Sequence, residues 1–348
     1  MKIVIATVQV PFIRGGAEMH AAGLKRILIE AGHEVEIIAI PFKWYPPERI
    51  TEHILACRLL DLSESSGQAI GMLIGLKFPA YYIPHSNKVI WLLHQYRDAY
   101  ELWGTEFGSL HRYPNGETIR KVIRSCDNKF LKEAKRIYAN SENVAQRLQR
   151  FNDIYAEPLY HPPADYERFY CDNSDDYLLF ISRLTPIKRP HLAIEAMKLV
   201  KAPVRLVIVG TTDNDNYQQH LFQLIEKNGL KERILFLKDI NNQQKFKLFA
   251  KALGILFIPF DEDYGYVTLE AFYSHKPVIT CKDSGGPLEF VEDKVNGFTV
   301  SPYPEAIAEA IEKICNNKEK AKKMGEAGYE KLRALNINWE SVITKLTQ

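Results

Sequence analysis

The chain has 348 residues, of which 46% are hydrophobic and 25% charged, and its 45 basic and 43 acidic residues give a net charge of +2. Single hydrophobic cores stop growing at roughly 250–300 residues, so this length predicts two domains. The near-neutral charge argues against nucleic acid as a partner. No stretch approaches the roughly 18 apolar residues of a membrane-spanning helix. The five cysteines lack C-x-x-C or metal-ligand spacing, which favours a reducing, cytoplasmic location without disulfides or a zinc site.

Strand-like apolar runs alternate with helix-like patterns in the first half of the chain. The first run, 2–8, follows a lysine and lacks the hydrophobic extension of a signal peptide, so it predicts a strand. The elements that follow are predicted at 17–32 (helix), 34–40, 50–64 (helix), 69–78, 88–96 and 136–141. Such alternation implies a mostly parallel sheet covered by helices.

A polar connector with three prolines, at 155–176, interrupts the alternation, which then begins again. Strands are predicted at 177–184, 204–210, 233–239, 254–260 and 277–281. Helices are predicted at 189–200, 216–229, 241–252, 267–276 and 303–317. The second half therefore repeats the α/β pattern of the first.

Two Rossmann-like domains facing across a cleft are the simplest architecture for these two series. We predict an N-terminal acceptor domain at 1–168 and a C-terminal donor domain at 169–335. A short amphipathic helix at about 336–348, with Trp339 on one side, can pack back on the N-terminal domain.

The first strand–helix turn contains Gly15 and Gly16. Paired glycines permit close backbone approach and leave N–H groups at a helix start, where an anion is stabilised. The spacing does not match the G-x-G-x-x-G fingerprint of dinucleotide-binding proteins, so a plain flexible loop stays an equal alternative.

The first strand of the second series is followed by "SRLTPIKRP", which contains Arg183 and Lys188. Ligands bind at the carboxyl ends of parallel strands, and an arginine fork with a lysine point charge suits a diphosphate. The alternative is a solvated basic turn.

Two carboxylates, Glu262 and Glu270, flank an aromatic–glycine core in "ILFIPFDEDYGYVTLEAFYSHK". The helix that starts there offers N–H groups near Val267 and Thr268 to a phosphate. Carboxylates accept hydrogen bonds from sugar hydroxyls, each contributing about 1.5–3 kcal/mol for a charged acceptor. The alternative is a strand, a turn and a helix whose glutamates only keep it solvated.

Together these segments resemble the retaining glycosyltransferases of family 4, which have the two-Rossmann GT-B fold. "EDYGYVTLEAF" resembles the family's two glutamates separated by seven residues, and "SRLTPIKRP" resembles its Arg-Leu-x-x-x-Lys segment. "GGAE" and "SGGPLEFVEDKVNGF" resemble further segments in the family's order, so the likeness covers nearly the whole chain. The chain departs from the family at Asp263, where glycine is usual, and at "VGTTDNDNY", which replaces a Gly-x-Gly turn.

The resemblance implies a role for each matching residue. Arg183 and Lys188 would bind the donor diphosphate, Glu270 the ribose and Glu262 the transferred sugar. His94, after the apolar part of the strand predicted at 88–96, would lie beside the donor sugar, or else be a structural histidine. The implied catalytic residues are His94, Arg183, Lys188 and Glu262. The implied donor-binding residues are Gly15, Gly16, Arg183, Lys188, Gly210, Ile240, Glu262, Tyr266, Val267, Thr268 and Glu270.

The activity implied by the resemblance is transfer of a hexose from a UDP- or GDP-linked sugar to an acceptor hydroxyl, with retention and without metal or cofactor. The Asp-x-Asp patterns at 213–215 and 261–263 leave open a metal-dependent GT-A transferase. Further alternatives are a non-catalytic sugar-nucleotide-binding protein and a GT-B epimerase or phosphorylase.

The segment 112–150 has ten basic and four acidic residues. An anionic membrane attracts such a segment, which favours a lipid-linked acceptor and a peripheral position at the inner membrane face. A solvated helix face, with a saccharide acceptor, is the alternative. We expect a monomer or weak dimer.

Overall fold

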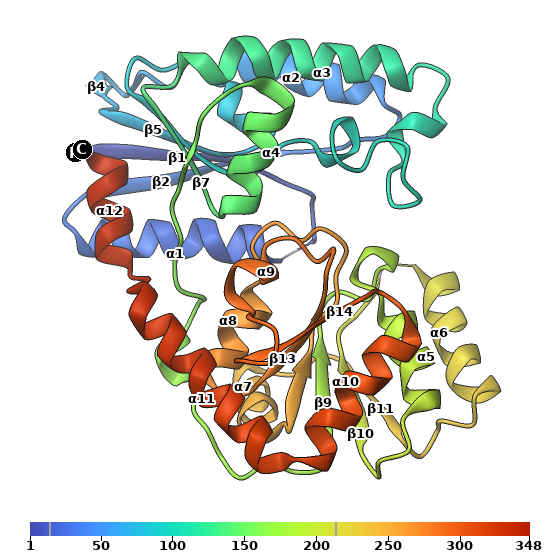
Figure 1. Cartoon of the computed structure of the whole chain (residues 1–348). Coiled ribbons are helices and arrows are strands. Elements are labelled where there is room, and N and C mark those ends of the chain that lie inside the picture. The colour runs from blue at the N-terminus through green and yellow to red at the C-terminus, as the bar shows by residue number, and fades with distance from the viewer. Residues whose placement is uncertain (14, 213) are drawn as a thin grey trace. The chain divides into compact units, whose positions relative to one another are not determined.

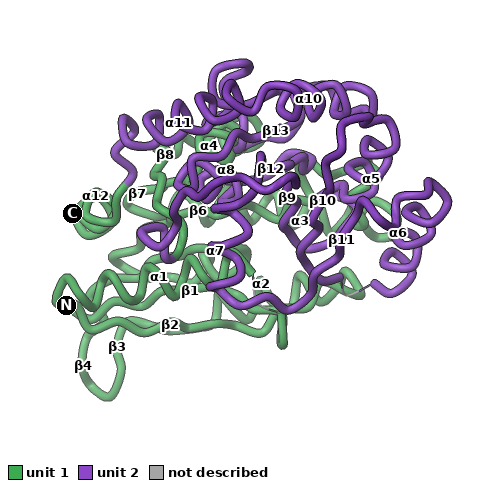
Figure 2. Tube along the Cα trace, turned by 90° about the horizontal axis from the view of Figure 1, so that it is seen from below, with its two compact units in different colours: residues 1–164, 338–348 green, residues 165–337 purple. Residues whose placement is uncertain are grey.

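The computed structural model describes residues 1–13, 15–212 and 214–348, and the chain divides into two compact units. Unit 1 comprises Met1–Ala164 and Asn338–Gln348, and unit 2 comprises Asp165–Ile337 (Figure 2). Each unit contains its own six-stranded parallel sheet. The predicted α/β class is therefore confirmed.

The sheet of unit 1 has the strand order β2-β1-β5-β6-β7-β8 (Figure 1). The strands are β1 (Lys2–Gln9), β2 (Glu34–Pro41), β5 (Met72–Lys77), β6 (Lys88–His94), β7 (Arg136–Ala139) and β8 (Glu157–Pro158). A separate hairpin is formed by β3 (Glu64–Ser65) and β4 (Gln68–Ala69), where the sequence predicted the end of a helix. The helices are α1 (Gly16–Glu30), α2 (Glu48–Leu59), α3 (Gly116–Phe130), α4 (Glu142–Asn152) and α12 (Trp339–Thr347).

Side chains of β1 alternate between the two faces of this sheet, as expected for a strand buried on both sides. Ile3 and Ile5 pack with α1 and α12, whereas Ala6 and Val8 pack with α2, α3 and α4. Trp339 at the start of α12 lies over Gly23, where an added Cβ would be 3.3 Å from the indole. The last helix of the chain is therefore part of the core of unit 1.

The sheet of unit 2 has the order β11-β10-β9-β12-β13-β14. Its strands are β9 (Tyr177–Ile181), β10 (Arg205–Val209), β11 (Ile234–Leu237), β12 (Gly254–Leu256), β13 (Val278–Cys281) and β14 (Gly297–Val300). Its helices are α5 (Pro190–Leu199), α6 (Asp215–Lys227), α7 (Asn242–Lys251), α8 (Tyr266–Tyr273), α9 (Pro287–Phe290), α10 (Pro304–Asn316) and α11 (Lys318–Leu335).

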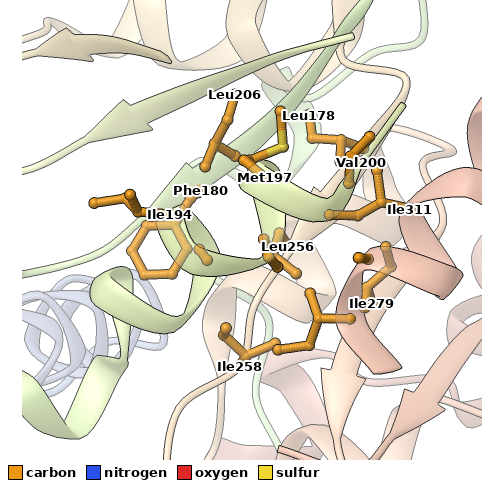
Figure 3. Packing of buried hydrophobic residues seen from close by; sticks show 14 of the residues in the cluster. Leu178, Phe180, Ile194, Met197, Val200, Leu206, Leu256, Ile258, Ile279 and Ile311 are labelled. Carbon is orange, nitrogen blue, oxygen red and sulfur yellow. The ribbon is translucent and has the colours of Figure 1, made fainter. Parts of the chain in front are cut away.

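Hydrophobic side chains, mostly from the sheet, α5 and α10, form the core of unit 2. Figure 3 shows ten of them by name: Leu178, Phe180, Ile194, Met197, Val200, Leu206, Leu256, Ile258, Ile279 and Ile311. Burying one such side chain contributes about 1.5–3 kcal/mol, so this cluster fixes the positions of the strand ends. In the described ranges, every helix is too short or too polar to cross a membrane.

Candidate active site

The candidate site of unit 2 lies where the strand order of its sheet reverses. β9 pairs with β10 on one side and with β12 on the other, and all three strands are parallel. The loops that leave the carboxyl ends of β9 and β12 therefore diverge at a topological switch point, the place where open α/β sheets bind ligands.

Lys188 and Glu262 meet at this switch point. Lys188 ends the 3-10 helix η6 (Pro186–Lys188) after β9, and Glu262 lies in the loop after β12. Their side chains form an ion pair and are 15% and 20% exposed. The Phe260 N–H donates to the Ile187 carbonyl over 2.8 Å, so the backbones of the two loops are joined as well. A ligand at this edge would meet a cation and a carboxylate together.

The segment after β9 also contains two arginines, one exposed and one buried. Arg183 is exposed and has no side-chain partner in the part of the chain that the structure describes. Arg189 is buried and donates two hydrogen bonds to Asp283, of 2.8 and 2.7 Å. The sequence analysis did not predict the Arg189–Asp283 pair, because nothing in the sequence "IKRP" indicates that Arg189 is buried. Arg183 is thus available to an anion, whereas Arg189 holds the loop after β13.

Two glycines in the loops at the strand ends lie so close to other main-chain atoms that a larger side chain would clash. A Cβ on Gly210, which has φ 149°, would lie 1.9 Å from the Ser182 carbonyl oxygen. A Cβ on Gly286 would lie 2.7 Å from the carbonyl oxygens of Asp263 and Tyr264. The main-chain carbonyl of Glu262 accepts a hydrogen bond from the Gly286 N–H over 2.8 Å. The predicted donor-site residue Gly210 therefore has a structural reason to be glycine.

Helix α8 begins beside Glu262. Its N-cap, Gly265, has φ 89°, a conformation that favours glycine. Tyr266 and Val267 in the first turn are partly buried. Thr268 is fully buried, and its N–H donates to the Gly265 carbonyl over 2.9 Å. The side chain of Thr268 is therefore out of reach of a ligand in this structure.

Glu270, one turn into α8, is paired with Lys245 of α7. The Nζ–Oε1 distance is 2.5 Å, and the side chains are 6% and 23% exposed for Glu270 and Lys245, respectively. Burial raises the pKa of Tyr266, and the Glu270 charge raises it further. Ile240, the residue expected beside the base, is half-buried and immediately precedes the N-cap of α7. Sequence reasoning missed Lys245, since a lysine on an amphipathic helix is normally a surface residue.

In unit 1, Gly15 caps α1 and Gly16 begins it. The Gly15 N–H donates to the Glu18 carboxylate over 2.7 Å, so this predicted anion donor already has an acceptor within the chain. His94 is the last residue of β6 and is half-buried. Its Nδ1 lies 2.6 Å from the Gln95 carbonyl oxygen, which requires Nδ1 to carry the proton. When the ring is neutral, Nε2 is then the accepting nitrogen.

The basic segment 112–150 forms α3, β7 and α4. A cavity of about 540 Å³ on α3 is lined by Glu117, Arg120, Lys121, Arg124, Ser125, Asn128 and Lys129. Arg147 does not belong to an exposed basic face, because it is buried and lies 3.2 Å from Glu101. Membrane contact by this segment stays a prediction.

Metal-ligand clusters of three or more His, Cys, Asp or Glu side chains do not occur in residues 1–13, 15–212 and 214–348. Asp213 of the first Asp-x-Asp pattern lies outside the described residues. A second cavity, of about 440 Å³, is lined by η5 (Tyr166–Arg168), α8 and α11 and excludes Lys188, Glu262 and Glu270. The candidate site is thus defined by the switch point, and neither of these two cavities coincides with it.

Solved structures share this architecture along the whole chain. The sucrose-phosphate synthase of Thermosynechococcus elongatus matches with a TM-score of 0.79 and 17% identity, covering 100% of this chain and 98% of the other. HepE of Anabaena, in complex with UDP-glucose, matches with a TM-score of 0.72 and 18% identity over 100% and 98% of the two chains. The two parallel six-stranded sheets are those of a GT-B-like fold.

Sequence comparison identifies the family. Residues 169–331 match the family described as "Glycosyl transferases group 1". The match covers nearly all of unit 2, and the recognition of a family 4 glycosyltransferase from its motifs is confirmed.

Individual relatives match over different lengths. The α-1,3/1,6-mannosyltransferase ALG2 of Homo sapiens is 32% identical over 45% of this chain and 40% of its own length. The chain therefore matches less than half of that relative. An uncharacterized glycosyltransferase of Methanocaldococcus jannaschii, MJ1607, is 23% identical over 91% of this chain and 90% of its own length.

Proposed function

We propose that the protein is a retaining glycosyltransferase that moves a hexose from a UDP- or GDP-linked sugar to an acceptor hydroxyl without a divalent cation. The observation that carries this proposal is the Lys188–Glu262 pair at the switch point of unit 2, together with the exposed Arg183 in the same segment after β9. The names of similar proteins support the donor class, because ALG2 is a mannosyltransferase and HepE was crystallised with UDP-glucose.

Each charged group has a distinct proposed partner. A lysine ammonium has three N–H donors, so Lys188 can bind a phosphate oxygen and stay paired with Glu262. Arg183 supplies a fork of donors to the same diphosphate. Glu262 accepts from a sugar hydroxyl, and Glu270 accepts from the ribose. The backbone at Ile240 lies beside the base.

The chemical step breaks the bond between C1 of the sugar and the β-phosphate oxygen, and the electron pair leaves with the phosphate. The acceptor oxygen bonds to C1 on the same face, and its proton goes to the departing phosphate oxygen. Arg183 and Lys188 stabilise the charge that develops on that phosphate. Losing one such preorganised donor typically costs about 2.7–4 kcal/mol of activation free energy. The roles implied for His94, Gly15 and Gly16 in unit 1 stay predictions from the resemblance.

The proposal is tested by incubating the protein with UDP- and GDP-linked hexoses and with saccharide or lipid-linked acceptors. Release of nucleoside diphosphate with an α-linked product from an α-linked donor, unchanged by EDTA, is expected. Loss of activity in EDTA, restored by Mn²⁺ or Mg²⁺, would instead favour a metal-dependent transferase. Sugar conversion with donor alone would indicate an epimerase, and turnover that requires orthophosphate a phosphorylase. Binding without any turnover would indicate a non-catalytic protein.

A further inference from the structure

Unit 1 contains a buried carboxylate, Asp127, that the proposed reaction does not use. It lies on α3, is completely buried and accepts four side-chain hydrogen bonds. Its Oδ1 accepts from the hydroxyls of Tyr81 (2.9 Å) and Tyr82 (2.7 Å). Its Oδ2 accepts from Gln95 Nε2 (2.8 Å) and from the Tyr100 hydroxyl (2.6 Å). Four donors match the roughly four acceptor positions of an ionised carboxylate.

The two oxygens of Asp127 hold different segments. Tyr81 and Tyr82 belong to the 3-10 helix η1 (Ala80–Tyr82), which lies between β5 and β6. Gln95 and Tyr100 belong instead to the segment that leaves the carboxyl end of β6. Oδ1 is therefore bound to the connection before β6, and Oδ2 to the connection after it.

The side chain of Gln95 is fixed from a second direction. Its Nε2 also donates to Asn152 Oδ1 over 3.0 Å, and Asn152 Nδ2 in turn donates to Asn128 Oδ1 over 2.7 Å. Gln95 is 5% exposed. Burial raises the pKa of Asp127, and the four hydrogen bonds act against that rise. A buried network of this kind, with its donors satisfied, holds its members in one arrangement.

Gln95 connects this network to His94. The His94 Nδ1–H donates to the main-chain carbonyl of Gln95 over 2.6 Å. Anchoring the Gln95 side chain in the core therefore also fixes the carbonyl that selects the ring orientation and tautomer of His94.

We propose that Asp127 and Gln95 are positioning residues for His94, acting through the Oδ2 side of the buried carboxylate. The inference rests on the proposed function and on the role that the family resemblance implies for His94, beside the donor sugar. The Oδ1 side serves the fold alone. The two oxygens of one carboxylate thus provide a matched pair of test sites.

The test compares Gln95→Met with Tyr81→Phe in the full chain. Each variant removes one hydrogen bond to Asp127, the first at Oδ2 and the second at Oδ1. Steady-state transfer gives kcat and the donor KM, urea unfolding gives the midpoint, and ¹H–¹⁵N NMR follows the His94 imidazole, assigned by its absence in His94→Gln.

Gln95→Met is expected to lower kcat by roughly 10- to 100-fold, the scale of a misplaced reacting group, with little change in the donor KM. The Nδ1–H signal of His94 should shift or disappear. Tyr81→Phe should lower the urea midpoint while it leaves kcat and the His94 signal as in the wild type. If Gln95→Met does not fold, Tyr100→Phe takes its place in the comparison, because Tyr100 is the other donor to Asp127 Oδ2.

A wild-type kcat and His94 signal in folded Gln95→Met would overturn the inference, as would equal losses of kcat in Gln95→Met and Tyr81→Phe. If the wild type transfers no sugar from any donor, the proposed function fails instead. The His94 signal then decides the positioning question by itself, because it needs no turnover.

Discussion

The two units hold their carboxylates in different ways. In unit 2, Glu262 and Glu270 are each paired with a lysine near the strand ends. In unit 1, Asp127 is buried among four uncharged donors. An ion pair can share its lysine with an anionic ligand, whereas removing a carboxylate from buried neutral donors deprives each of them of an acceptor. The difference favours a ligand-binding role for the charges of unit 2 and a scaffolding role for the charge of unit 1.

The largest expected effect comes from Asp127→Leu. The substitution leaves four buried donors without their acceptor, so the free energy of unfolding should fall by about 3–5 kcal/mol. Urea unfolding measures this loss. Arg26→Ala, which breaks an exposed ion pair with Glu30, is the control and should change stability by less than about 0.5 kcal/mol. A loss below about 1 kcal/mol for Asp127→Leu would mean that the network does not organise unit 1.

Next in size is the loss of turnover in Arg183→Ala and Lys188→Ala. Each should lower kcat by about 10²-fold or more, because each removes a donor to the leaving phosphate. The double variant should lose less than the product of the single losses, since groups that act as a unit are not additive. Lys198→Ala, an exposed lysine of α5, is the matched control. Near-normal turnover in either folded single variant would mean that Arg183 and Lys188 are solvated surface residues that do not bind the donor.

The two glutamates of unit 2 should separate in binding experiments. Glu270→Ala should weaken nucleoside diphosphate and nucleotide sugar alike, by roughly 10- to 100-fold for the loss of charge-assisted hydrogen bonds. Glu262→Ala should weaken mainly the sugar-bearing donor. Isothermal titration calorimetry with both ligands measures this, and an unchanged affinity for the diphosphate in Glu270→Ala would refute the ribose assignment.

A pH-dependent effect is expected from two buried histidines of unit 1. His20 Nδ1 lies 2.9 Å from His161 Nε2. Burial lowers the pKa of His20 from 6.5 to about 3, and burial together with His20 lowers the pKa of His161 well below 6.5. Below pH 6.5 the unfolded chain therefore binds protons that the folded unit does not, so stability falls as the pH drops toward 3.

Urea unfolding between pH 7 and 5 measures how steeply the free energy of unfolding changes with pH. Each histidine should contribute up to about 1.4 kcal/mol per pH unit once the pH is well below 6.5. His20→Gln removes one of the two groups and should reduce this part of the slope by about half. An undiminished slope in a folded His20→Gln variant would contradict the assignment.

The sequence was sufficient to predict the alternation of strands and helices, because their buried faces repeat with clear periods. The strand predicted at 2–8 corresponds to β1 (Lys2–Gln9). The helices α3, α4, α9 and α11 were not predicted as elements. Charged residues dominate α3 and α11, and the buried face of α11 contains small residues such as Ala321, Gly325 and Gly328, which give a weak apolar signal.

The sequence was sufficient to place the candidate-site residues after particular strands, but not to predict which side chains pair with them. Arg183, Lys188 and Glu262 were expected at strand ends, and they follow β9 and β12 in the structure. Their partners depend on which strands are neighbours in the sheet, and chain order does not give that. Lys245 of α7 meets Glu270 of α8 across 25 residues of sequence, and Asp127 meets its donors across 27 to 46 residues.

The most direct test of the central claim compares nucleoside diphosphate with nucleoside monophosphate. If Arg183 and Lys188 bind the β-phosphate, the wild type should bind UDP or GDP at least about 10-fold more tightly than the matching monophosphate, since a charge-assisted hydrogen bond contributes about 1.5–3 kcal/mol. Arg183→Ala and Lys188→Ala should each reduce that preference, while Lys198→Ala keeps it. Equal affinity for diphosphate and monophosphate in the wild type, or an undiminished preference in both site variants, would contradict the account.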